Sequence, residues 1–150
     1  MARVTRTRTI EAPLGDVWKL VSDPHSLPRW WPRTARVENV AGDGGRGTRW
    51  TQVLETSEGR GVRADFRCLS SAEGERHVWE QEVEGTPFER HLIAWRVEIG
   101  LRERDEGTEV SLSSVQTLRG LSRLGSPMMR RAQGAQLDEA LDGIERMGGT

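Results

Sequence analysis

Cysteine is almost absent from this sequence, in which Cys68 is the only one among 150 residues. A single cysteine excludes an internal disulfide and any cysteine-rich metal site. Cys68 falls in a stretch with strand periodicity, which predicts a small buried hydrophobic side chain. We expect neither a bound metal nor a cofactor.

The sequence also lacks a long apolar run and an excess of either charge. No segment approaches the roughly 20 apolar residues of a membrane-spanning helix, and the N-terminus has no apolar signal core. The 22 basic and 23 acidic residues leave a net charge of −1. This balance argues against general nucleic-acid or membrane-surface binding, and we expect a cytoplasmic protein.

Tyrosine is absent and phenylalanine occurs only twice, yet the chain has six tryptophans. Six indoles carry too much apolar area to decorate a surface. They are expected either to fill the core or to line something hollow.

The C-terminal stretch predicts a long amphipathic helix from Pro127 to about Met147. Pro127 suits the first helical position, with Ser126 as a possible cap, and Gly148 and Gly149 suit the stop. At 100° per residue, one stripe of this helix is almost entirely apolar. It contains Met129, Gln133, Leu137, Ala140, Leu141, Ile144 and Met147.

The rest of the chain predicts strands that supply an apolar surface for this helix. Residues 3–10 alternate as a strand, and Pro13 opens a short helix to about Val21. A second short turn follows and ends near Trp30 and Trp31. From Thr48 onward, alternating faces separated by turns predict an antiparallel meander. We therefore expect one α+β domain over residues 1–150, with a strongly curved sheet around the last helix.

Four stretches together resemble the START-like (SRPBCC) superfamily, and within it the polyketide cyclase/dehydrase-type proteins. They are Thr9–Trp18, Ser22–Pro32, Gly45–Trp50 and Leu118–Met129. The resemblance implies a helix-grip fold: a seven-stranded antiparallel sheet wrapped around a long C-terminal helix, with two short helices between the first two strands. It also implies an apolar cavity between sheet and helix. Members of the superfamily carry lipids, sterols, quinones, hormones or polyketide intermediates, and only some are enzymes.

The inward strand faces and the helix stripe together predict a mostly apolar pocket with a few neutral hydrogen-bonding groups. If the turn at Gly85–Pro87 is a tight hairpin, Trp79 lies across from Trp95, and the two indoles can sandwich a flat ligand. The alternative is that they only fill the core. The predicted ligand-binding residues are Trp50, Gln52, Phe66, Trp79, Gln81, His91, Ile93, Trp95, Ser114, Met129 and Gln133.

Gln133 is the one polar residue in its apolar stripe. A buried amide without a partner costs about 1–3 kcal/mol. Its partner is therefore either a strand side chain, such as Gln52 or Ser114, or a ligand or water in the cavity. The sequence leaves both possibilities open.

Catalysis has few candidate groups. His77 and His91 are the titratable side chains on inward faces, and either is a conceivable general acid or base. Two separated histidines without an inward carboxylate fall short of a zinc site. Relatives of the aromatase/cyclase type tend to use a pocket arginine with tyrosine or other hydroxyl donors. This chain has no tyrosine, which departs from that pattern. Arg63 and Arg67 fall on the strand face expected to meet solvent, which leaves Arg6 and Arg8 as candidates to stabilise an enolate.

Three functions compete at this point. The leading hypothesis is a protein that binds a small lipid-, polyketide- or aromatic-like molecule beneath the long helix. An enzyme of the polyketide cyclase/dehydratase type, acting in the same cavity, is the alternative. The third is a protein-interaction module in which exposed Trp30 and Trp31 form the contact patch; otherwise, these two anchor the second short helix to the sheet. Whether the protein is a monomer or a homodimer stays open.

Overall fold

The computed structural model describes residues 2–56, 58–59, 61–90, 92–118 and 127–148. The strands are β1 (Ala2–Ile10), β2 (Thr34–Ala41), β3 (Arg49–Glu55), β4 (Gly61–Ala72), β5 (Arg76–Gln81), β6 (Leu92–Arg104) and β7 (Gly107–Leu118). The helices are α1 (Leu14–Ser22), α2 (Leu27–Trp30) and α3 (Pro127–Gly148), with short 3₁₀ helices η1 (Pro24–Ser26) and η2 (Pro87–Arg90).

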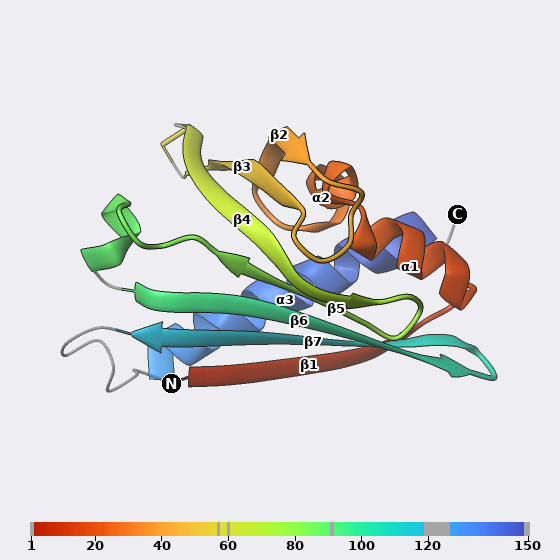
Figure 1. Ribbon diagram of the computed structural model, residues 1–150. Coiled ribbons are helices and arrows are strands. Elements are labelled where there is room, and N and C mark those ends of the chain that lie inside the picture. Colours follow the sequence, from red (N-terminus) through yellow and green to blue (C-terminus); the bar gives the residue numbers. More distant parts are fainter. Residues whose placement is uncertain (1, 57, 60, 91, 119–126, 149–150) are drawn as a thin grey trace.

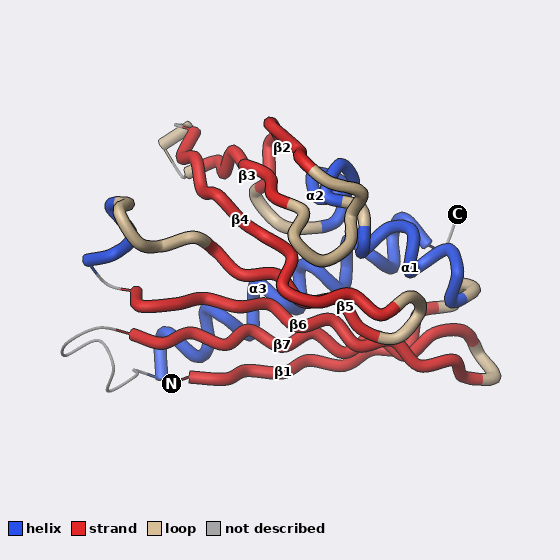
Figure 2. Tube along the Cα trace, viewed as in Figure 1, coloured by secondary structure: helices blue, strands red, loops and turns tan. Residues whose placement is uncertain are grey.

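All seven strands form one antiparallel sheet in the order β1-β7-β6-β5-β4-β3-β2. The sheet bends so that β2, β3 and β4 rise above the plane of β1, β7 and β6, and α3 runs along its concave side (Figure 1). The short helices α1 and α2 close one end of this arrangement (Figure 2). The α+β helix-grip prediction is therefore confirmed. No helix in the described ranges is long and apolar enough to cross a membrane.

Helix α3 begins at Pro127, as the proline at a first helical position predicts. Its buried face follows the predicted stripe, because residues three and four apart share one side of a helix. The predicted cap Ser126 and the second stop residue Gly149 lie outside the described residues. The buried residues of α3 are Gln133, Gly134, Leu137, Ala140, Leu141, Gly143 and Ile144.

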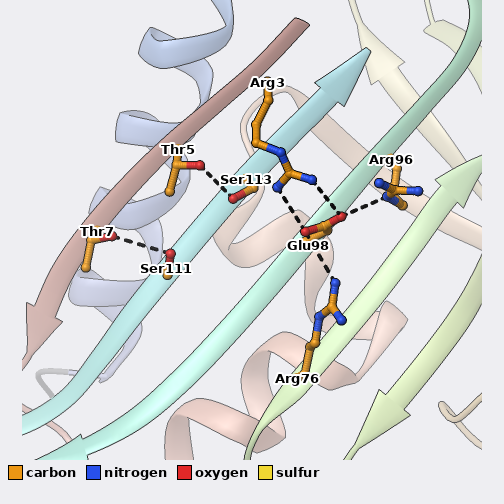
Figure 3. A network of polar contacts seen from close by, with 8 residues as sticks. All are labelled: Arg3, Thr5, Thr7, Arg76, Arg96, Glu98, Ser111 and Ser113. Atoms are coloured by element: carbon orange, nitrogen blue, oxygen red, sulfur yellow. Dashed lines mark hydrogen bonds and ion pairs between the residues drawn. The ribbon is translucent and has the colours of Figure 1, made fainter. Parts of the chain in front are cut away.

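The convex face of the sheet is covered by paired charges. Glu98 on β6 accepts from three arginines, at 3.1 Å from Arg3, 2.9 Å from Arg96 and 3.3 Å from Arg76 (Figure 3). Partial burial opposes ionisation of Glu98, but the hydrogen bond from Arg3 and the three positive charges outweigh it and lower its pKa. Beside this network the hydroxyls of Thr5 and Ser113 hydrogen-bond at 2.8 Å. This face is wet, as the alternation of the strands predicts.

Two local predictions for the start of β6 are wrong. The connection from β5 to β6 contains η2 and is not a tight hairpin, so Trp79 pairs with Val97 and not with Trp95. The pairing of β6 with β7 also shifts register between Leu92 and Ala94. Ile93 lies at this irregularity and is 52% exposed, so it does not belong to the buried face.

Candidate ligand-binding site

Tryptophan rings fill the centre of the molecule. Trp79 of β5 lies at the centre of this tryptophan cluster. Its ring centroid is 5.4 Å from that of Trp31, 5.9 Å from that of Trp30 and 6.2 Å from that of Trp50. Trp31 also contacts Trp95, at 6.4 Å, so it lies between the two indoles that were expected to sandwich a ligand. The three contacts of Trp79 are edge-on, a favourable geometry for aromatic pairs. The indoles thus fill the core at this point, and the sandwich prediction is wrong.

Trp30 and Trp31 are only 2% and 3% exposed. A pair this deeply buried cannot form an exposed contact patch, so the interaction-module hypothesis is wrong in that form. The alternative, that they anchor α2 to the sheet, is confirmed by their ring contacts with Trp79.

Four of the predicted ligand-binding residues use their polar groups inside the core. The indole N–H of Trp50 donates to Gln52 Oε1 at 3.0 Å, and the amide of Gln52 donates to Thr34 Oγ1 at 3.4 Å. The indole N–H of Trp95 donates to Ser114 Oγ at 2.9 Å. Gln52 and Ser114 therefore satisfy buried partners.

A cavity of about 730 Å³ lies beside this cluster. It is bordered by the first half of α3, by η2, and by residues near the end of β3, the start of β4 and the end of β7. Leu54 and Val62 contribute from β3 and β4, Phe88 from η2, and Met129 from α3. Gln116, Gln133, Gln136 and Thr56 supply neutral polar groups, and Arg33, Glu55 and Glu139 supply charge. Its remaining described lining residues are Pro32, Ala132 and Ala135.

Gln133 is the distinctive residue of this cavity. It is 5% exposed, and neither Oε1 nor Nε2 has a hydrogen-bond partner among the described residues. Gln52 and Ser114, the strand partners that were considered for it, are occupied by the indoles. A buried amide left unpaired in this way is costly, so the partner of Gln133 is expected to come from whatever occupies the cavity.

A family model described as polyketide cyclase / dehydrase and lipid transport matches residues 1–147. The chain belongs to this family. No curated protein sequence matches the chain.

Solved structures of this family's fold superpose closely. The di-domain ARO/CYC StfQ from the steffimycin biosynthetic pathway matches with a TM-score of 0.78 at 13% identity, over 98% of this chain and 50% of that one. A START superfamily protein from Mycobacterium smegmatis matches at 0.77 and 14% identity, over 98% and 97%. TTHA0849 from Thermus thermophilus matches at 0.75 and 22%, over 97% and 96%. The chain thus spans about half the length of the di-domain protein, and at these identities the likeness concerns the fold.

The histidines predicted as general acid or base are not among the described residues that line the cavity. His77 does not line it. This histidine is 2% exposed, lies edge-on to Trp18 and Trp79, and its Nδ1 is 3.0 Å from Ser71 Oγ. Burial lowers the pKa of His77 to about 4, because the charged form is poorly solvated there. His91 lies outside the described residues.

The two candidate arginines are engaged by α3. Arg8 Nη1 lies 2.6 Å from Asp142 Oδ1, and Arg6 Nε lies 3.6 Å from Asp138 Oδ1. Both carboxylates come from the side of α3 that faces β1. Neither arginine lines the cavity, so the structure brings no predicted enolate-stabilising group to it.

Ile93 is exposed and His91 lies outside the described residues. The other nine predicted ligand-binding residues divide into two groups. Met129 and Gln133 line the cavity. Trp50, Gln52, Phe66, Trp79, Gln81, Trp95 and Ser114 are buried in the core beside it. Leu54, Val62 and Gln116 fall on faces that strand alternation already marked as inward, whereas Phe88 sits in η2, for which the sequence showed no periodicity.

No described residues form a group of three or more side chains suited to hold a metal. Cys68 is 2% exposed, and burial raises the pKa of its thiol, as expected for a small buried hydrophobic residue.

Proposed function

We propose that this protein binds a small hydrophobic molecule that carries an uncharged hydrogen-bonding group, in the cavity between the sheet and the first half of α3. The observation that carries the proposal is the buried and unpartnered amide of Gln133 within a largely apolar wall. An amide offers one acceptor and two donors. A hydroxyl, carbonyl or phenol on the ligand satisfies it without the desolvation cost of a charge.

The volume supports a ligand of moderate size. A cavity of about 730 Å³ falls within the ordinary range for small-molecule sites. Leu54, Val62, Phe88 and Met129 give the ligand apolar contact, and Arg33, Glu55 and Glu139 bring charge. A lipid-, polyketide- or aromatic-like molecule fits this arrangement. The cyclase alternative has less support, because His77, Arg6 and Arg8, the predicted catalytic candidates among the described residues, do not line the cavity.

Filling the cavity is expected to abolish binding. Ala132 is exposed and lines the cavity, so Ala132→Trp places an indole in it without disturbing the core. We expect the affinity for the neutral dye Nile red to fall at least about tenfold, which corresponds to about 1.4 kcal/mol. Glu145→Trp, on an exposed part of the same helix, is the matched control and is expected to bind as the native protein does. Failure of the native protein to bind the dye saturably, with no copurified small molecule in native mass spectrometry, contradicts the proposal.

Replacing Gln133 with leucine is expected to separate stability from binding. The leucine side chain removes a buried unpaired amide at nearly constant volume, so the ligand-free protein gains about 1 kcal/mol in free energy of unfolding. Any molecule that copurifies with the native protein and bonds this amide is expected to be lost from the variant. Urea denaturation and native mass spectrometry measure the two effects. A less stable Gln133→Leu protein indicates instead that the amide has a structural partner.

A further inference from the structure

A second concave site lies on the other side of α3. It is a groove of about 430 Å³ between β1 and the first turns of α3, and it shares none of its described lining residues with the cavity. Because successive residues are 100° apart, Arg131 lies on the side of the helix opposite Met129 and Gln133, and Arg130 lies on the flank between the two sides. We call this feature the arginine groove. It is lined by Arg3, Val4, Thr5, Arg6, Arg130 and Arg131.

The arginine groove carries a local excess of positive charge that the net charge of the chain conceals. No described carboxylate lines it. Arg6 is 3.6 Å from Asp138, and Arg3 shares Glu98 with two other arginines (Figure 3). Arg130 and Arg131 are exposed and form no ion pair with another described residue. Arg130 and Arg131 thus lie beside Arg6 on one small concavity, whereas the guanidinium of Arg3 is held by Glu98 on the convex face of the sheet.

Arg6 lies against the backbone of α3 at Gly134, which has no side chain. Its Nη1 donates to the carbonyl oxygen of Thr5 at 3.1 Å. A Cβ atom at position 134 would lie 3.0 Å from Arg6 Cζ and closer still to Nη2. Glycine within a helix costs about 1 kcal/mol relative to alanine. At this position the missing side chain is what lets the guanidinium lie against α3.

We propose that the arginine groove is a binding site for a phosphate-type oxyanion. Guanidinium groups match the oxygens of phosphate in paired hydrogen bonds. The groove offers two, Arg130 and Arg131, that pair with no described carboxylate, and a third, Arg6, whose ion pair with Asp138 is long at 3.6 Å. The chemistry is shared by free phosphate esters and by the headgroups of acidic phospholipids. The site goes beyond the proposed hydrophobic ligand and does not depend on it.

Titration with inorganic phosphate at constant ionic strength, followed by NMR of the backbone amides, tests this proposal. We expect saturable shifts at β1 and the start of α3 in the native protein. In Arg130→Gln/Arg131→Gln the affinity is expected to fall at least tenfold. The control Arg46→Gln/Arg102→Gln removes the same charge from exposed arginines elsewhere and is expected to change the affinity less than twofold. No saturable binding, or equal losses in both double variants, overturns the proposal.

Gly134→Ala gives a test that leaves every arginine in the chain. The new methyl group displaces the guanidinium of Arg6, and we expect phosphate affinity to fall about threefold or more while the helix remains intact. Unchanged affinity overturns the role given to Arg6.

Cosedimentation with vesicles distinguishes the two sources of the anion. Vesicles of phosphatidylcholine are compared with vesicles that contain phosphatidic acid. Cosedimentation only with the acidic vesicles, lost in Arg130→Gln/Arg131→Gln, identifies a lipid headgroup. Phosphate binding without cosedimentation identifies a soluble phosphate compound. Cosedimentation that the double variant leaves unchanged overturns the assignment to this groove.

Discussion

Replacing Gly143 with alanine is expected to lower the free energy of unfolding by about 2–3 kcal/mol. Gly143 lies on the buried face of α3, where α2 crosses it. A Cβ atom there would lie 2.7 Å from Trp30 Cα and would also clash with the carbonyl of the same residue. These are backbone atoms, so the clash is relieved only by separating the two helices. Trp30 belongs to the tryptophan cluster, so that movement loosens the core and outweighs the gain of about 1 kcal/mol in helix propensity.

Gly134→Ala is the matched control for this prediction. It makes the same substitution on the same buried face of the same helix. The atoms in its way belong to the end of the Arg6 side chain, which is flexible and can swing into solvent. We expect the stability to stay the same or to rise by up to about 1 kcal/mol. Urea unfolding followed by tryptophan fluorescence measures both variants, and equal stabilities would show that α2 does not press on Gly143.

The elements of the fold could be predicted because their signals are local. The stripe of α3 and its start at Pro127 depend only on the spacing of residues within one helix. Strand alternation correctly placed buried residues such as Phe66, Trp79 and Leu112, each no more than 2% exposed. Local periodicity also identified Gln133 as the one polar residue in the apolar stripe of α3, and the proposed function rests on this residue.

The position of the cavity could not be predicted in the same way, because it depends on long-range packing. Residues on an inward face either meet another side chain or border a hollow, and alternation alone does not distinguish these outcomes. Here Trp31 enters from the segment after α2 and occupies the space between Trp79 and Trp95. The cavity therefore lies toward the N-terminal end of α3, beside Met129 and Gln133.

The errors at β6 have a similar cause. A shift of one residue in register moves a side chain to the other face of a sheet. The irregularity between Leu92 and Ala94 leaves Ile93 exposed, and the sequence around it gives no sign of this, since a bulge depends on the partner strand. The connection between β5 and β6 is likewise longer than the tight hairpin that was expected, because it contains η2, and Trp79 therefore pairs with Val97 instead of Trp95.

Acidification is expected to destabilise the native protein through His77. Its pKa is lowered from 6.5 to about 4 in the folded state because burial disfavours the charged ring. Above pH 6.5, the pKa of the ring in the unfolded chain, the ring is neutral in both states and its burial carries no charge penalty. Between the two values the unfolded chain binds the proton more tightly, so stability falls as the pH falls. The loss is about 2 kcal/mol between pH 7.5 and 5.0 and about 3 kcal/mol by pH 4.

The variant His77→Phe keeps an aromatic ring against Trp18 and Trp79 but cannot be protonated. We expect its stability to change by less than half as much as that of the native protein between pH 7.5 and 5.0, whatever its absolute value. This window is diagnostic because the lowered carboxyl pKa values, at Glu38 and Glu98, come into play only below 4.5. His25 is exposed, so His25→Gln is the control that should retain the native slope. If His77→Phe retains the native slope as well, the ring of His77 is protonated in the folded core at ordinary cost, and the tryptophan cluster is more open to water than its packing indicates.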